Sequence, residues 1–424
     1  MLKKHFTEYS AYAWLVIGLC AGLLFYKYVL SVSPSIMTDE LMLQFQVTGA
    51  RLGNLAATFF YTFLVVQLFV GILLDKYGAR WLASLSLAVS ALGALLFACA
   101  HSIGHAELAR GLMGFGAAFA TVTYLKMTAV WFEQKRAAFV GGLLATAVML
   151  GAVFGEAPLA LMVDSWGWRG AMMVCAVFGF VIAALFALLV RDRSRLHAAF
   201  FQEKNDAFSW ETLKTVLTNP QNWLLTFYSG LAFSPLGVFG GLWGNPFLRE
   251  AHQLTRVEAA SLVSIMFVGL GIGSPVFGLI SDYWGKRRLP MFLGASLSLL
   301  ALLGVIYLTN VPFWALGTLL FLFGFGTGAF MLCFALGRQL NSLAAAATVI
   351  ALINTGDGIL GSLSEPLIGK LLDLGWNHQM QNGIRYFPIP DYHHAFIPLL
   401  VYLLLALGLL VFIRENNPKS SPIR

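Results

Sequence analysis

Long, unbroken apolar runs constrain the fold of this chain more than any other feature. Of its 424 residues, 58% are hydrophobic and only 11% are charged, whereas about 25% of a soluble domain is charged. A helix needs roughly 20 apolar residues to cross the ~30 Å hydrocarbon core of a membrane, and most of the runs reach that length. Because the runs are continuous, they exclude a β-barrel, whose strands alternate apolar and polar residues. The sequence therefore predicts an all-α integral membrane protein.

The runs predict about twelve transmembrane helices. We expect these helices at about 12–35, 51–74, 81–101, 107–132, 138–163, 168–190, 221–248, 257–281, 289–309, 311–337, 344–372 and 394–414. The first run contains Lys27 and has no small-residue cleavage site, so we interpret it as a retained helix rather than a signal peptide. Most Lys and Arg residues between the runs fall on the side that holds both chain ends, which predicts cytoplasmic termini. The net charge of +7 is therefore attributed to topology and not to nucleic-acid binding.

The sequence is duplicated. The loop after the second run reads Gly-x-x-x-Asp-x-x-Gly-x-Arg over 71–80, and a closely similar pattern returns at 278–287 after the eighth run. Pro158 recurs as Pro366 and Gly114 as Gly324, each about 208 positions later. We therefore expect two parallel six-helix repeats, at 1–190 and 220–424, joined by a polar cytoplasmic linker at 191–219.

These repeats and their loops resemble the major facilitator superfamily. Arg110, followed by small residues near the start of the fourth run, is similar to a second family element, and Gly151 to Pro158 partly keeps a third. The resemblance implies two six-helix halves around a central cavity lined by spans 1, 4, 7 and 10, alternating access, a monomer, and no cofactor. Glu156 and Ala157 stand where many family exporters carry glycine before the proline, which disfavours a drug exporter.

The two repeated loops are the candidate gates. Each acidic side chain can pair with the arginine that follows or cap a neighbouring helix, and each glycine permits a tight reversal. A purely topological role is the alternative. The gating candidates are Asp75, Gly78, Arg80, Asp282, Gly285 and Arg287.

Charged residues inside the apolar runs are the candidate substrate ligands, because a charge near the bilayer centre costs at least about 2.5–3.5 kcal/mol. Lys27 lies mid-run between Tyr26 and Tyr28, whose rings and hydroxyls can hold a small polar solute. The alternative for Lys27 is a pair with an acid such as Asp357, and the alternative for Lys126 is snorkelling to the headgroups. The full set of substrate-binding candidates is Tyr26, Lys27, Tyr28, Tyr124, Lys126, Tyr228, Asn354 and Asp357. The remaining aromatic residues and glycines are attributed to helix packing.

Glu156 is the candidate proton carrier. A carboxyl group in an apolar setting takes up a proton more readily, and a nearby cation reverses that preference. Arg110 on the adjacent run is the expected cation, and Glu365 occupies the place equivalent to Glu156 in the second half. The alternative is that both glutamates satisfy backbone donors near prolines. Asp357 is the second choice for the proton.

We therefore predict a secondary transporter of a bacterial inner membrane that imports a small carboxylate-bearing solute, such as an amino acid, by proton symport. Short segments near Lys27, Lys126 and Glu156 are similar to a proteobacterial group that includes intraphagosomal (Pht-type) amino-acid and nucleoside importers. An organic-anion, nucleoside or siderophore carrier and an exporter of small amphiphiles are the alternatives. A transporter-like sensor is disfavoured because only ten residues follow Arg414. An enzyme and a metal site are not expected, because the sequence has no nucleophile and base pair, phosphate loop or metal-ligand spacing.

Overall fold

The computed structural model describes residues 2–132, 134–191, 210–342 and 345–415. Most of the predicted linker, residues 192–209, lies outside these ranges. The chain divides into two compact units. Unit 1 comprises Met1–Val47 and Leu55–Glu203, and unit 2 comprises Thr48–Asn54 and Lys204–Arg424. The short segment Thr48–Asn54 therefore clusters with unit 2, although the helix that it begins continues in unit 1.

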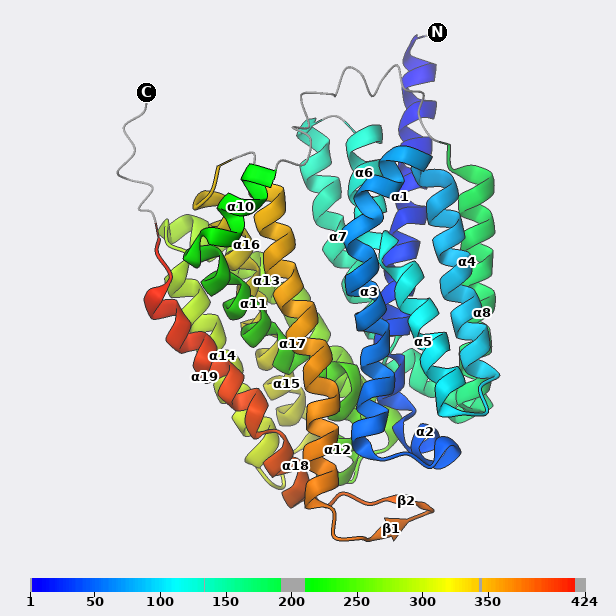
Figure 1. The fold of residues 1–424 in the computed structure, drawn as a ribbon, viewed down its shortest axis with the longest axis vertical. Helices are drawn as coiled ribbons and strands as arrows, with labels where there is room; N and C mark the ends of the chain where they lie inside the picture. The colour runs from blue at the N-terminus through cyan, green and yellow to red at the C-terminus, as the bar shows by residue number, and fades with distance from the viewer. Residues whose placement is uncertain (1, 133, 192–209, 343–344, 416–424) are drawn as a thin grey trace. The chain divides into compact units, whose positions relative to one another are not determined.

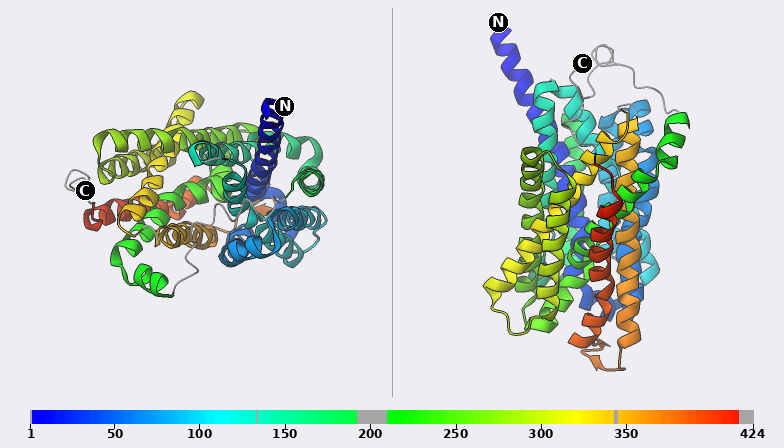
Figure 2. Two further views of the ribbon diagram at one scale, coloured as in Figure 1. Left: turned by 90° about the horizontal axis from the view of Figure 1, so that it is seen from above. Right: turned by 90° about the vertical axis from the view of Figure 1, so that its left-hand side faces the viewer.

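Unit 1 is helical throughout its described residues, and its long helices lie side by side (Figures 1 and 2). Its elements are α1 (Leu2–Val32), the 3₁₀ turn η1 (Ser33–Ile36), α2 (Thr38–Phe45), α3 (Gly49–Tyr77), α4 (Ala79–Ala98), α5 (Ile103–Ala117), α6 (Phe119–Trp131), α7 (Gln134–Phe154) and α8 (Ala157–Leu189). Helix α8 is interrupted at Gly167, whose φ of 70° is accessible to glycine at little cost.

Unit 2 repeats this bundle and adds a small hairpin (Figure 1). Its elements are α10 (Trp210–Thr218), α11 (Pro220–Val238), the π-helical turn η2 (Phe239–Trp243), α12 (Gly244–His252), α13 (Arg256–Trp284), α14 (Arg288–Tyr307), α15 (Phe313–Thr327), the 3₁₀ turn η3 (Gly328–Met331), α16 (Leu332–Gln339), α17 (Ala346–Gly375), β1 (Met380–Gln381), β2 (Ile384–Arg385), α18 (Ile389–Ala395) and α19 (Ile397–Phe412).

The hairpin turns at Asn382 and Gly383, whose φ values of 52° and 80° suit an Asn-Gly turn between antiparallel strands. Just beyond it, the Tyr386 hydroxyl donates to the Glu250 carboxylate of α12. This hydrogen bond raises the pKa of Tyr386 above its usual range, because the carboxylate stabilises the protonated phenol. The hairpin is thereby fastened to the bundle.

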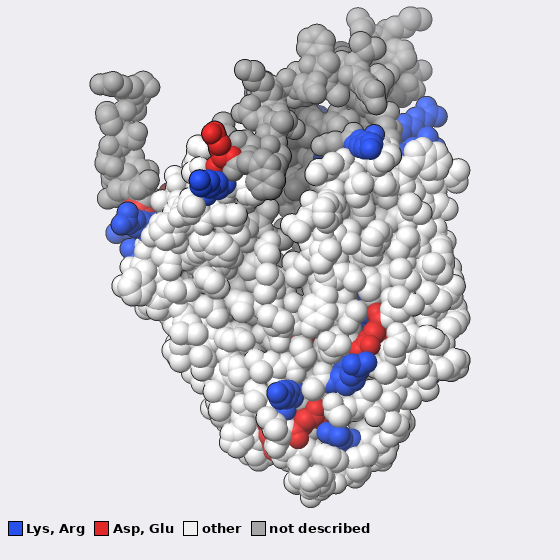
Figure 3. All heavy atoms as spheres, viewed as in Figure 1, with Lys and Arg blue, Asp and Glu red and all other residues white. Residues whose placement is uncertain are grey.

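Ten stretches of the described residues are long and apolar enough to cross a membrane. Two predicted spans, 138–163 and 168–190, fall within one stretch of 50 residues, Val140–Leu189, and the predicted span 344–372 is not among the ten. The count of twelve helices and the cytoplasmic placement of the termini therefore stay predictions. On the face shown in Figure 3, charged side chains lie mainly near the ends of the molecule, and most of the surface between them is uncharged. Such a surface suits contact with lipid.

The same contacts recur in both units, as the duplicated sequence predicts. A side chain at Gly114 of α5 would collide with a main-chain carbonyl of α3, and one at Gly324 of α15 would collide with a carbonyl of α13. The Ser90 hydroxyl donates to a carbonyl of α5 at 3.1 Å, and Ser298 donates to a carbonyl of α15 at 3.0 Å. Glycine at these positions lets helix backbones approach closely, as is common in membrane bundles.

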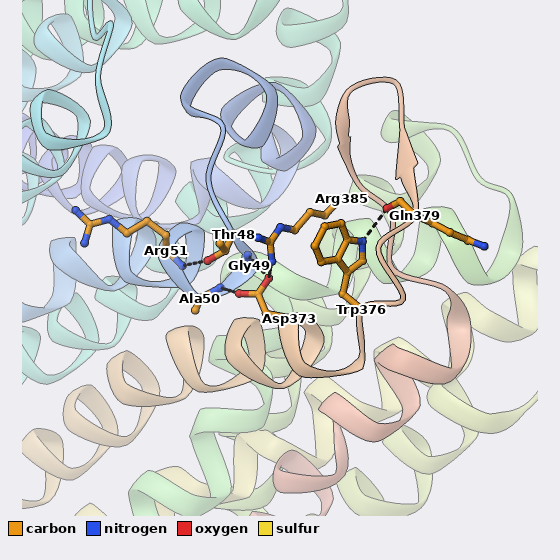
Figure 4. Close-up of polar contacts among 8 residues, drawn as sticks. All are labelled: Thr48, Gly49, Ala50, Arg51, Asp373, Trp376, Gln379 and Arg385. Atoms are coloured by element: carbon orange, nitrogen blue, oxygen red, sulfur yellow. Dashed lines mark hydrogen bonds and ion pairs between the residues drawn. The ribbon is translucent and has the colours of Figure 1, made fainter.

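The N-terminus of α3 is held by a carboxylate of α17 (Figure 4). Asp373 accepts the backbone N–H of Gly49 at 2.9 Å and that of Ala50 at 2.8 Å. The Arg385 guanidinium lies 3.0 Å from the same carboxylate and 4.2 Å from the centre of the Trp376 ring. The first backbone donors of a helix have no partner within the helix, so this carboxylate supplies the missing acceptors.

Candidate functional site

The most unusual cation of unit 1 is Lys27, at the middle of the apolar part of α1. Its side chain is only 8% exposed, and its Nζ lies 4.3 Å from the centre of the Phe63 ring and 4.8 Å from that of Tyr28. Among the described residues of unit 1, no carboxylate pairs with this ammonium and no hydrogen bond reaches it. The site is thus an aromatic cage around a cation that keeps its three N–H donors available.

A second buried cation of unit 1, Arg110, contacts the same row of aromatic rings on α3. Phe63 and Phe59 stack with ring centres 6.5 Å apart, and Arg110 lies 4.9 Å from the centre of the Phe59 ring. The Arg110 guanidinium donates to the carbonyl of Leu30 at 2.6 Å and to that of Ala56 at 3.0 Å. Arg110 therefore binds carbonyls at the end of α1, where a cation is favoured by the helix dipole.

Phe59 and Phe63 are not among the predicted ligands, because in the sequence they are indistinguishable from the packing aromatics. Their spacing of four residues places them on one face of α3, and that spacing is the signal that could have found them. The sequence does not show which residues of other helices that face contacts. Only the fold shows that it points at the two cations.

Glu156 lies between α7 and α8 and is the non-helical residue that immediately precedes α8. Its side chain is fully buried, and its Oε1 accepts the Ser35 hydroxyl of η1 at 2.9 Å. The carboxyl group therefore lies close to the turn that follows α1. A part in proton coupling stays a proposal for Glu156 and Arg110, as it does for Glu365.

Several other predicted ligands of unit 1 bind main-chain carbonyls. The Tyr124 hydroxyl donates to Val140 at 2.7 Å, and the Lys126 ammonium donates to Leu74 at 2.7 Å. Leu74 is in the last turn of α3, so Lys126 neutralises part of that helix terminus. Tyr26 is almost fully buried in the core. The two hydrogen bonds account for the positions of Tyr124 and Lys126, whereas the buried Tyr26 hydroxyl has no hydrogen-bond partner among the described residues. Contact with a substrate remains a prediction for each.

In unit 2 a predicted ligand of α17, Asp357, contacts the neighbouring helix α11. Its Oδ1 accepts the Ser229 hydroxyl of α11 at 2.5 Å. Asn354 lies one turn earlier on the same helix and is half-buried. The Tyr228 hydroxyl, also predicted as a ligand, donates to the Met291 carbonyl at 3.4 Å.

Glu365 occupies a different environment, nearer the C-terminal end of α17. It is 2% exposed, and its main-chain carbonyl accepts the indole N–H of Trp243 at 2.9 Å. Trp243 belongs to the π-helical turn η2, a type of irregularity that is frequent at functional sites.

The two repeated loops are built alike. Gly78 has a φ of 85° and Gly285 a φ of 63°, so each loop reverses at a position that favours glycine. In the second loop, Arg287 lies 2.6 Å from the Asp282 carboxylate. In the first, the Arg80 guanidinium donates to the Ala187 carbonyl at 2.7 Å.

The side chain of Asp75 is outside the described residues, so the matching ion pair with Arg80 stays a prediction. In the second half, the arginine that follows Arg287 takes the role of Arg80. Arg288 donates to the Val411 carbonyl of α19 at 3.2 Å. Each arginine thus binds the last turn of the final described helix of its own unit, and that helix end favours cations.

Known proteins are similar to this chain in sequence or in fold. The Major Facilitator Superfamily profile matches residues 14–364 and 236–424. The membrane sensor protein UhpC of Salmonella typhimurium is 25% identical over 67% of this chain and 66% of its own length. The probable L-galactonate transporter of Escherichia coli is 25% identical over 61% of this chain and 58% of its own, and the probable sulfoacetate transporter SauU of Cupriavidus necator is 22% identical over 85% and 87%.

A solved structure also matches the fold. A bacterial homolog of the human lysosomal transporter Spinster, in an inward-facing and unoccupied conformation, superposes with a TM-score of 0.77 at 15% identity, over 95% of this chain and 97% of that one. The resemblance inferred from the repeated loops is confirmed, because the family profile covers far more than half of the sequence. Members of this family are multi-pass membrane transporters and not enzymes. The chain belongs to the Major Facilitator Superfamily.

Proposed function

We propose that the protein is a secondary transporter that carries a small organic anion across a bacterial inner membrane into the cell, together with a proton. One observation carries the proposal. The buried ammonium of Lys27 is held by two aromatic rings and has no carboxylate partner among the described residues of unit 1. An anionic group of the substrate would supply the missing partner.

The energies favour a ligand at this position. Each cation–π contact contributes about 0.5–2 kcal/mol, so the two rings together offset about 1–4 kcal/mol of a cost that is at least about 2.5–3.5 kcal/mol for a charge near the bilayer centre. A hydrogen bond to a charged group contributes about 1.5–3 kcal/mol. Three free N–H donors of Lys27 therefore favour a compact anionic group such as carboxylate, sulfonate or phosphate.

The names of two relatives also support an anionic substrate. Galactonate carries a carboxylate, and sulfoacetate carries a carboxylate and a sulfonate, so both compounds are anions at neutral pH. An amino acid, the example given by the sequence, would also need a partner for its ammonium, which Asp357 or Glu365 of unit 2 would have to provide. We therefore place simple organic anions first and amino acids second.

A sensor is the second candidate, because UhpC is named a membrane sensor protein. A sensor would bind the same anion through Lys27 without moving it. Binding and transport must therefore be measured separately.

The test uses purified protein in proteoliposomes and in detergent. Galactonate, sulfoacetate, a hexose phosphate, an amino acid and a nucleoside are compared for binding, for exchange, and for accumulation under an inward proton gradient. We expect at least one anion to accumulate in the vesicles. Binding without exchange or accumulation would favour the sensor, and preference for the nucleoside would refute the proposal.

The role of Lys27 is tested by Lys27→Met. Losing one charged hydrogen-bonding partner should weaken binding of the anion about 10- to 150-fold, since each 1.4 kcal/mol is about tenfold. Lys27→Arg retains the charge and should weaken binding less. Lys214→Met changes an exposed lysine of α10 in the same way and should have no effect. Unchanged affinity in Lys27→Met would refute the assignment of this residue.

A further inference from the structure

We propose that the carboxyl group of Asp357, with Ser229 as its partner, binds and releases the proton that drives transport. This inference rests on the proposed function and adds to it the site of coupling. Glu156, the first choice from the sequence, is fully buried in unit 1. Asp357 is less buried than Glu156 and lies where α11 and α17 pack closely together.

Close contact between two helices fixes the position of Asp357. The neighbouring residue, Gly356, packs against α11 so tightly that a side chain there would collide with the Thr226 carbonyl. On the facing helix, a Cβ at Gly230 would lie 2.6 Å from the Gly356 carbonyl oxygen. These glycines are adjacent in sequence to Asp357 and Ser229. The close packing of α11 and α17 therefore brings the Asp357 carboxyl group within hydrogen-bond distance of the Ser229 hydroxyl.

The chemistry of the partner suits a group that changes its protonation state. A hydroxyl can donate to a carboxylate and can also accept from a carboxylic acid, so Ser229 can stay hydrogen-bonded to Asp357 in both states. An ion pair would instead favour the charged form of the acid. Asp282 and Asp373 both have an arginine partner, whereas Asp357 accepts a hydrogen bond from the Ser229 hydroxyl.

The other titratable groups around α17 do not pair with Asp357. On α16, the Cys333 thiol is fully buried and faces Asp357 and Ser229. On α11, the Tyr228 hydroxyl is engaged with a carbonyl of α14. Among the described residues, no hydrogen bond or ion pair joins Asp357 to the remaining charged or titratable groups of the elements packed against α17. These groups are Arg51, Glu211, Lys214, Arg338, Asp391, Tyr392, Tyr402 and the two histidines of α18.

The proton balance is simple. The Asp357 carboxylate takes up one proton on one side of the membrane and becomes a neutral acid, and it returns the proton on the other side. One proton carried with one monovalent anion moves no net charge. Accumulation of such an anion should therefore follow the pH gradient and be insensitive to the membrane potential.

The experiment compares wild type with Asp357→Asn, which keeps the shape of the side chain but cannot release a proton. We expect Asp357→Asn to lose accumulation driven by a pH gradient while exchange of the anion between the two sides continues within about twofold, since exchange requires no net proton movement. Asp357→Glu should recover part of the accumulation. Asp164→Asn removes an exposed carboxylate of α8 and should behave as wild type.

Accumulation that survives in Asp357→Asn would overturn the proton site and leave the proposed anion transport intact. Failure of the wild type to bind or exchange any anion would overturn the proposed function itself. A measurement without substrate separates these cases. Infrared spectra of the purified protein should contain a carboxylic-acid C=O band that titrates with pH and is lost in Asp357→Asn, and a spectrum unchanged by the substitution would reject Asp357 as a group that binds a proton.

Discussion

Removing the Asp373 carboxylate should loosen the N-terminus of α3. Asp373→Ala leaves the N–H groups of Gly49 and Ala50 without their acceptor and takes away the partner of Arg385. Loss of a side-chain cap costs about 0.5–2 kcal/mol. The ion pair adds about 0.2–1 kcal/mol, since both side chains are partly exposed and Arg385 keeps its contact with the Trp376 ring. We expect a total of about 1–3 kcal/mol.

Hydrogen exchange measured by mass spectrometry tests this value locally. A loss of about 1–3 kcal/mol from the local opening free energy should speed exchange in the peptide covering residues 48–54 by about 5- to 150-fold. Peptides from α13, a helix that does not touch Asp373, serve as the internal reference.

Two variants separate the contribution of the cap from that of the ion pair. Asp373→Asn retains one acceptor oxygen and should give a smaller increase than Asp373→Ala. Arg385→Gln removes the ion pair but keeps both caps, so exchange should rise less than about fivefold. Unchanged exchange in Asp373→Ala would refute the capping argument, and an effect of Arg385→Gln as large as that of Asp373→Ala would show that the ion pair, and not the cap, holds the helix.

Two further substitutions test packing in the separate units. Arg110→Lys removes the guanidinium that binds carbonyls of α1 and α3, and a lysine can replace only one of these charged hydrogen bonds. We therefore expect a loss of about 1.5–3 kcal/mol in stability, measured as a lower unfolding temperature in detergent. An unchanged temperature would contradict a stabilising role for these hydrogen bonds. Gly356→Ala should cost about 1–3 kcal/mol by overpacking α17 on α11, whereas Gly361→Ala on the same helix, where a Cβ meets nothing within 4 Å, should be neutral in the same assay.

Much of the architecture could be predicted because the bilayer and the duplication restrict it. Long apolar runs permit few structures other than membrane helices, and the repeat predicts that Gly114 and Gly324 have matching contacts, as they do. Gly78 and Gly285 likewise reverse the chain at positive φ in matching loops. These features depend on local sequence and on one symmetry relation, both of which can be read from a single chain.

The contacts of individual polar side chains could not be predicted in the same way. Lys126 and Tyr124 are predicted substrate ligands, and the sequence does not show that each donates to a main-chain carbonyl of its own unit. Any buried donor can find such an acceptor, and the choice depends on the rotation of each helix about its axis. The stacked rings of Phe59 and Phe63 were missed for the same reason. Periodicity shows that residues share a face, but not what that face meets.

The two units use the same scaffold to hold different charged groups. Unit 1 buries Lys27 and Arg110 against aromatic rings, and Arg110 also binds carbonyl oxygens. Unit 2 places Asp357 beside the Ser229 hydroxyl, a partner that tolerates an acid in either state. A lysine ammonium suits binding of an anion, and an acid that can change its charge suits carriage of a proton. Divergence of the duplicated halves in these few residues would therefore be sufficient to separate substrate binding from coupling.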